Sequence, residues 1–177
     1  MKKIALIGLV LSLFVTAGDA NAGEPKLLGS YGGWSAYYYY ENGSKVCYMA
    51  SIPEKAEGNY TKRGDIFAFI THRVADNVEN EFNYIAGYPY LEGSEPVLSI
   101  DGNKFILYTN GEVAWADDSS ANYGSMSADN AIAAAIRKGS KMIVKGKSKR
   151  STLTTDSFSL KGSSKAHDAI NKECNVK

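Results

Sequence analysis

Alternation of apolar and polar residues along most of the chain predicts β-strands. Aromatic and β-branched residues dominate these segments, and turn residues separate them. Asp101-Gly102 and Asn110-Gly111 each stand between two apolar segments, and such pairs tolerate the positive φ angles of tight hairpins. Residues 97–115 are therefore predicted to form a three-stranded antiparallel meander. The predicted strands cover residues 34–40, 45–51, 65–72, 81–88, 97–100, 104–108, 112–115, 141–147 and 152–160.

Two short helices complete the predicted fold. Ser127 is a suitable N-cap for an alanine-rich helix over 129–137, with Gly139 to end it. A second helix is predicted to start after Gly162-Ser163 and to run toward Cys174. Residues 66–70 are apolar throughout, and such a strand needs cover on both faces. We expect an all-β fold, an antiparallel β-sandwich or partly closed barrel with two short capping helices.

The start of the chain has the pattern of a cleaved secretory signal peptide. Lys2 and Lys3 precede an apolar run over 4–17, and Ala20-Asn21-Ala22 offers a cleavage site after Ala22. The apolar run is shorter than the roughly 20 residues of a membrane-spanning helix. We expect residues 1–22 to be removed and 23–177 to form a single domain without a transmembrane anchor, exported to the periplasm, the outer surface or the medium.

Charge is distributed unevenly along the predicted mature chain, whose formal net charge is zero. Residues 23–136 carry 7 basic and 15 acidic groups, whereas 137–177 carry 11 basic and 3 acidic groups. In a continuous strand, the odd-numbered lysines of the basic tail share one face. They form either a lysine-protected edge strand or an anion-binding face for lipid or glycan. The residues of this possible face are Lys141, Lys145, Lys147 and Lys149.

The two cysteines, Cys47 and Cys174, are predicted to form a disulfide, because thiols of exported proteins are usually oxidised. Ala166, Ile170 and Cys174 recur every four residues, which places the cysteine on the apolar face of the predicted helix. A catalytic or metal-binding thiol is the alternative. Neither cysteine has a CxxC partner or a nearby histidine to support it.

The sequence offers few candidates for catalysis. It lacks the GxSxG, HExxH and phosphate-loop patterns, and we expect no catalytic residues, no cofactor and no metal site. His72 and His167 are far apart and are expected to be solvated, although a triad assembled by folding would make the protein a hydrolase. Asp156 lies among hydroxyl residues and is expected to be structural. Residues 37–40 are four tyrosines, of which two should face outward.

Ten segments stand in a recognisable order along the chain: Trp34, 47–49, 87–89, 100–102, Trp115, 135–139, 142–148, 154–162, Ala166 and Cys174. In this order they resemble the invasion-associated locus B family of exported alphaproteobacterial proteins. The family is named for a protein implicated in erythrocyte invasion, and no catalytic activity is established for its members as a class. The chain differs at Tyr38, where many members have an extra cysteine, and at Ser151, where a glycine is usual; serine is tolerated there unless a positive φ is required.

From these features we expect a non-enzymatic exported cell-envelope protein that contributes to host-cell interaction or invasion. Its expected partner is a protein, a glycan or an anionic lipid at the envelope, and no specific nucleic acid. A periplasmic structural or stress-related binding protein without a host partner is the first alternative. A hydrolase without a recognisable motif is the second.

Overall fold

A computed structural model describes residues 23–119 and 126–177 of the chain, so the predicted signal peptide lies outside the described residues. Strands dominate this part, and the helical elements are α1 (Ala128–Lys138), α2 (Ser163–Cys174) and the 3₁₀ turn Val74–Asp76. The strands are β1 (Lys26–Tyr31), β2 (Trp34–Glu41), β3 (Ser44–Ser51), β4 (Lys55–Gly58), β5 (Phe67–Arg73), β6 (Val78–Ile85), β7 (Val97–Ile100), β8 (Asn103–Asn110), β9 (Val113–Ala116), β10 (Lys141–Lys147) and β11 (Leu153–Ser159).

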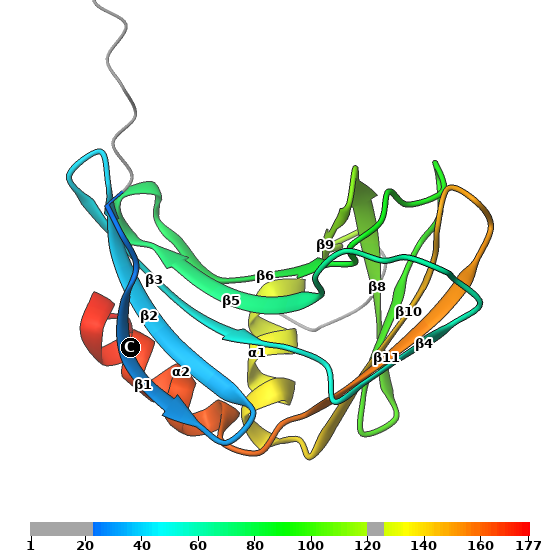
Figure 1. Cartoon of the computed structure of the whole chain (residues 1–177). Helices are drawn as coiled ribbons and strands as arrows, with labels where there is room; N and C mark the ends of the chain where they lie inside the picture. Colours follow the sequence, from blue (N-terminus) through cyan, green and yellow to red (C-terminus); the bar gives the residue numbers. More distant parts are fainter. Residues whose placement is uncertain (1–22, 120–125) are drawn as a thin grey trace, which may run out of the picture.

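The strands form one antiparallel sheet in the order β1-β2-β3-β5-β6-β9-β8-β7-β10-β11-β4. Strand β8 joins its two parts, because its first half pairs with β7 and its second half with β9. Strand β4 follows β3 closely in the chain but lies at the opposite edge of the sheet. The sheet therefore curls strongly, as Figure 1 shows, without closing into a barrel.

The core lies inside the curl and under the two helices. The rings of Tyr84 on β6 and Phe158 on β11 meet edge to face, with centroids 6.2 Å apart, so distant strands of the sheet contact each other across the interior. Helix α2 packs on β1, β2 and β3, and α1 packs on β6 (Figure 1). On α1 the buried face is formed by Ala128, Ile132, Ala133 and Ile136.

The predicted fold class is confirmed: the protein is all-β and antiparallel, with two short helices. The meander over β7, β8 and β9 is present, and Ser127 caps α1 by accepting a hydrogen bond from the Asn130 N–H at 3.3 Å. The structure corrects the predicted strand over 81–88, because β6 ends at Ile85 and residues 87–88 form a bend. Strands β1 and β4 were missed by the sequence pattern.

The predicted disulfide between Cys47 and Cys174 is present and ties the end of α2 to β3. Both cysteines are buried, and Lys45 forms an ion pair of 2.5 Å with Glu173 beside them. The apolar stripe expected on the second helix is also observed, because Ala166 and Ile170 are fully buried. Helix α2 thus has its last turn fixed covalently to β3, the third strand from one edge of the sheet.

The outer face of β5 is covered only by neighbouring rings. Ala68 and Ile70 are buried toward the core, whereas Phe67 and Phe69 are half-buried on the opposite face. There Phe69 contacts Tyr48 at a centroid distance of 6.0 Å, and Tyr48 stacks on Tyr37 at 5.1 Å. The expectation that a second layer covers this strand is therefore wrong, because the aromatic side chains partly shield one another on an open face.

Candidate functional site

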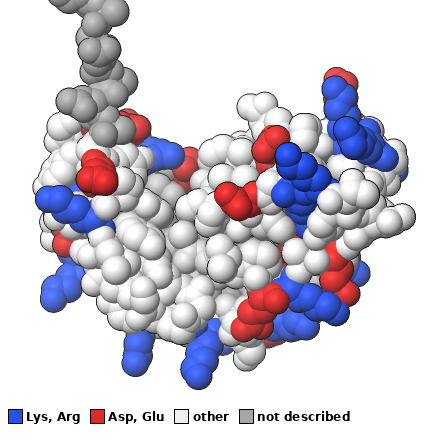
Figure 2. Space-filling model, in the orientation of Figure 1, with Lys and Arg blue, Asp and Glu red and all other residues white. Residues whose placement is uncertain are grey.

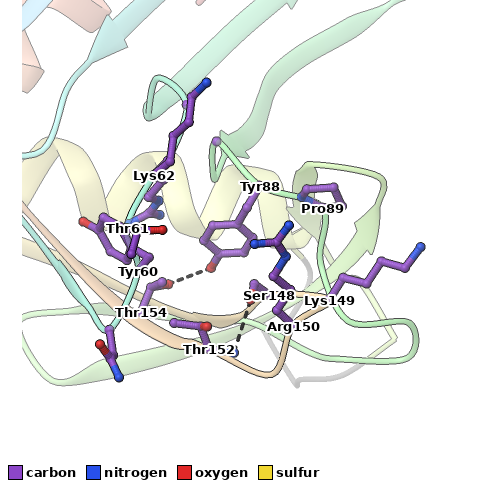
Figure 3. Close-up of a pocket in the computed structure, with 14 residues that line it drawn as sticks. Tyr60, Thr61, Lys62, Tyr88, Pro89, Ser148, Lys149, Arg150, Thr152 and Thr154 are labelled. Atoms are coloured by element: carbon purple, nitrogen blue, oxygen red, sulfur yellow. Dashed lines mark hydrogen bonds between the residues drawn. The ribbon is translucent and has the colours of Figure 1, made fainter.

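A pocket of about 700 Å³ lies where three loops meet at one end of the curled sheet (Figure 3). The loops are the segment before β5, the bend after β6 and the turn between β10 and β11. Because each loop is attached to a paired strand, the pocket has a firm frame. Its lining residues are Asn59, Tyr60, Thr61, Lys62, Arg63, Gly64, Gly87, Tyr88, Pro89, Ser148, Lys149, Arg150, Thr152 and Thr154.

A buried ion pair anchors the first of these loops. Two nitrogens of the Arg63 guanidinium donate to the two carboxylate oxygens of Asp156, each at 2.7 Å, and Nε donates to the carbonyl of Ala86 at 2.7 Å. The Arg63 and Asp156 side chains are only 4% and 1% exposed. A bidentate pair with this burial fixes both groups in position. Asp156 therefore holds a structural position, but its partners are the distant Arg63 and Tyr84 and not the hydroxyl residues beside it in the sequence.

Tyr84 completes the hydrogen-bond network beneath the pocket. Its hydroxyl donates to Asp156 at 2.5 Å and accepts from Arg63 at 3.1 Å. Burial, reinforced by the charge of Asp156, raises the pKa of Tyr84 far above its ordinary value, so this hydroxyl remains protonated. Burial opposes the charge on Arg63, but the hydrogen bonds that Arg63 donates to Asp156 act together with the charge of Asp156 and the neighbouring Tyr84, and their sum raises the pKa of the guanidinium. The Arg63 guanidinium therefore stays charged, and the Tyr84 hydroxyl stays a hydrogen-bond donor to Asp156.

Two glycines allow the Tyr88 side chain to lie inside the pocket. Gly87 has φ +70°, and a Cβ there would stand 2.5 Å from the carbonyl oxygen of Gly64. At Gly146 on β10, a Cβ would stand 2.7 Å from the Tyr88 hydroxyl. The Tyr88 hydroxyl bonds to Thr154 Oγ1 at 2.6 Å, as the dashed line in Figure 3 shows. The segment 87–89, which was expected to be a strand end, therefore presents a fixed aromatic ring to the pocket.

The turn between β10 and β11 presents two basic residues to the pocket. Ser151 N–H donates to the Ser148 carbonyl at 2.7 Å, which places Lys149 and Arg150 at the exposed corners of the turn. Ser151 itself has φ +64°. The exception stated for this position therefore applies, because Ser151 adopts the left-handed conformation that glycine adopts at low cost.

The rim of the pocket is strongly positive. Its lining includes Lys62, Arg63, Lys149 and Arg150 and no acidic residue. Asp156 neutralises Arg63, whereas the salt bridges within residues 23–119 and 126–177 include none of the other three cations. Figure 2 shows Lys and Arg side chains gathered on the side of the molecule formed by β4, β10 and β11. Figure 3 shows Arg150 directed toward Tyr88 and the side chains of Lys62 and Lys149 extending outward, so an anion in the pocket would have three unneutralised positive charges at its rim.

The four lysines predicted to share one face do not all lie on one surface of the protein. Lys141 and Lys145 are exposed on β10 and lie outside the pocket lining, Lys147 is half-buried, and Lys149 lies past the end of the strand. Strand β10 pairs with β11 on one side and β7 on the other. The edge-strand interpretation of these lysines is therefore wrong. Of the four, the structure brings only Lys149 into the pocket, where Lys62 and Arg150 join it.

Both histidines are buried, which corrects the expectation that they are solvated. His72 Nδ1 accepts from the Asn80 N–H at 3.0 Å, so its Nε2 carries the proton that bonds to Asn171 at 2.9 Å. His167 accepts from Arg137 at 2.6 Å and bonds to Asn80 at 2.7 Å. Burial lowers the pKa of both, that of His167 to about 4 with the charge of Arg137 adding to it. They are neutral links between the sheet and helix α2.

The sequence contained a signal for only part of this site. Segments 87–89, 142–148 and 154–162, which carry the family resemblance, supply Tyr88, Ser148 and Thr154 to the pocket. Lys62 and Arg63 were not singled out, because no motif in the sequence includes them; the neighbouring Asn59-Tyr60-Thr61 matches only the N-x-[ST] glycosylation pattern. The described residues contain no group of His, Cys, Asp and Glu side chains suited to holding a metal ion, and no helix among them has the length and apolarity needed to cross a membrane.

These features define a small, disulfide-linked, all-β protein with one helix-covered sheet and a basic pocket. Residues 34–171 match the family model described as Invasion associated locus B (IalB) protein. This match spans most of the chain, and the protein belongs to that family. The comparisons with curated proteins and with solved structures gave no match.

Proposed function

We propose that the protein is a non-enzymatic, exported binding protein of the cell envelope whose ligand enters the pocket of Figure 3. The pocket carries the proposal, because it combines aromatic rings, hydroxyl groups and cations on a frame fixed by the Arg63–Asp156 pair. Concave sites of about this volume, with a few fixed polar groups, are typical of ligand binding. The disulfide supports export, because such bonds persist in oxidising compartments.

The chemistry of the pocket supports binding rather than turnover. The carboxylate oxygens of Asp156 are both bonded to Arg63, and one also accepts from Tyr84, so this group is poorly placed to act as a base. Hydroxyl side chains line the pocket, but neither histidine is among the lining residues. His72 and His167 bond instead to asparagines, a backbone N–H and an arginine.

Family membership supports a role at the bacterial surface, and we include contact with a host cell in the proposal. The full-length gene should yield an exported protein whose N-terminus begins at Gly23. Antibody access on intact cells, with labelled protein binding to host cells or isolated envelopes, would support the surface role. Complete protection from added protease would overturn it in favour of the periplasmic alternative. A bound ligand recovered chemically unchanged by mass spectrometry supports binding, and a cleaved one refutes it.

A further inference from the structure

Among the described residues, the salt bridges leave out three positive charges that stand around the pocket on two separate loops. Lys62 precedes β5, whereas Lys149 and Arg150 occupy the turn before β11, and all three are exposed. The predicted mature chain has a formal net charge of zero, so this local excess does not reflect an overall basic protein. Like charges held around one concavity repel each other until an anion enters, which favours a negatively charged ligand.

Two tyrosine rings are held in place before any ligand arrives. The Arg63 guanidinium lies over both, at 5.4 Å from the Tyr60 centroid and 4.8 Å from the Tyr88 centroid. The Tyr60 hydroxyl donates to the Ala56 carbonyl at 3.1 Å, and Tyr88 is fixed by Thr154. Since Arg63 is itself neutralised by Asp156, it orders the rings and leaves the three exposed cations for the ligand. Rings ordered in advance lower the entropic cost of binding.

Hydroxyl groups occupy the space between the rings and the cations. Thr61, Ser148 and Thr152 line the pocket, and Ser148 Oγ accepts from the Thr152 N–H at 3.2 Å, which leaves its own proton to donate. Figure 3 shows these side chains around Tyr88. A ligand that satisfies this lining needs apolar faces for the rings, several hydroxyl groups and at least one negative charge. Acidic sugars have all three.

We infer that the pocket binds an acidic oligosaccharide, with its carboxylate or sulfate groups on Lys62, Lys149 and Arg150 and a sugar face against the tyrosines. A volume of about 700 Å³ falls within the range of small-ligand sites and fits about two or three sugar rings. This inference rests on the proposed function and specifies its ligand. The same groups serve carboxylated and sulfated sugars, so the experiment separates those two sources.

The test is titration calorimetry of the mature oxidised protein with trigalacturonic acid and a heparin-derived tetrasaccharide, with cellotriose as the neutral probe. We expect one acidic probe, or both, to bind with an affinity that falls as salt is raised, and cellotriose to bind much more weakly. The variant Lys149→Gln/Arg150→Gln should lower the affinity at least about 10-fold, equivalent to about 1.4 kcal/mol. Both side chains are exposed, so the fold is retained.

The matched control is Lys141→Gln/Lys145→Gln, which removes the same charge from exposed lysines outside the pocket. This control should change the affinity less than about 2-fold, because those charges are screened from the pocket. Tyr60→Leu should weaken binding without changing its salt dependence, because it removes stacking and no charge.

Two results would overturn the inference. One is an equal loss of affinity in Lys149→Gln/Arg150→Gln and in the control Lys141→Gln/Lys145→Gln. The other is an affinity for cellotriose equal to that for the acidic probes. Binding to vesicles of anionic phospholipid without binding to either acidic sugar would do so as well, in favour of a membrane ligand. A protein that binds isolated envelopes but neither acidic sugar overturns this inference and leaves the proposed function standing. Failure of both measurements removes the proposed function also.

Discussion

Replacing Asp156 by asparagine removes the negative charge of the ion pair beneath the pocket and keeps the shape of the side chain. Arg63, whose side chain is 4% exposed, then remains buried without a counter-ion. Breaking a buried pair in this way costs about 3–5 kcal/mol. For the 155 residues of the predicted mature chain, this corresponds to a fall in Tm of roughly 10–15 °C. Urea titrations and thermal melts of wild type and Asp156→Asn measure both values.

A variant that removes all three partners separates the charge effect from a general packing defect. Arg63→Met, Asp156→Leu and Tyr84→Phe together leave no buried charge and no unpaired hydroxyl from this network. We expect the triple variant to be less destabilised than Asp156→Asn alone, because apolar groups of similar volume often replace a buried pair at little cost. A loss of less than about 1 kcal/mol in Asp156→Asn, or a triple variant at least as unstable as the single one, would refute the reasoning.

Three further results are expected from the geometry. The oxidised, denatured protein should show no titratable thiol, and two free thiols would contradict the bond. Cys47→Ser should lower the unfolding free energy by about 4–5 kcal/mol, because the disulfide joins residues that are 127 positions apart in the chain. His167, with its pKa lowered to about 4, stabilises the fold fully above pH 6.5, and about 2–3 kcal/mol should be lost as pH falls from 6.5 through 4. Asp129 acts in the opposite direction, because burial raises its pKa to about 6. Urea titrations that compare wild type with His167→Gln at each pH isolate the contribution of His167. A difference in stability that does not change with pH would disprove this prediction. Ser151→Gly should raise stability by about 0.5–1 kcal/mol and Ser151→Ala should not, because φ is +64° there; equal melting temperatures for the two variants would count against strain.

Local patterns predicted the elements whose stability depends on nearby residues. The Asp101-Gly102 and Asn110-Gly111 turns form the expected hairpins. Ser127 is the N-cap and Gly139 the C-cap of the first helix, as expected. Strands β1 and β4 were missed for a physical reason. They are short edge strands, and all four residues of β4 are exposed, so backbone pairing with β11 defines it without any apolar alternation.

The candidate site was only partly predictable for a related reason. The lysine row was expected from strand alternation, which cannot show that Lys149 leaves the strand or that Lys62 lies on the same pocket. Similarly, nothing near Arg63 in the sequence indicates Asp156, which lies 93 residues away. Their proximity depends on how the sheet curls, and that is a property of the whole chain.

The amino-acid sequence by itself determined the all-β class, the positions of the two helices and the pairing of Cys47 with Cys174, which are the only cysteines available. Each of these follows from residue spacing or from elimination among few candidates. Only the tertiary structure decided that Arg63 meets Asp156 and that three cations surround one pocket. Contacts between distant residues depend on strand order and sheet curvature, which arise from packing of the whole core and leave no periodic signal in the chain.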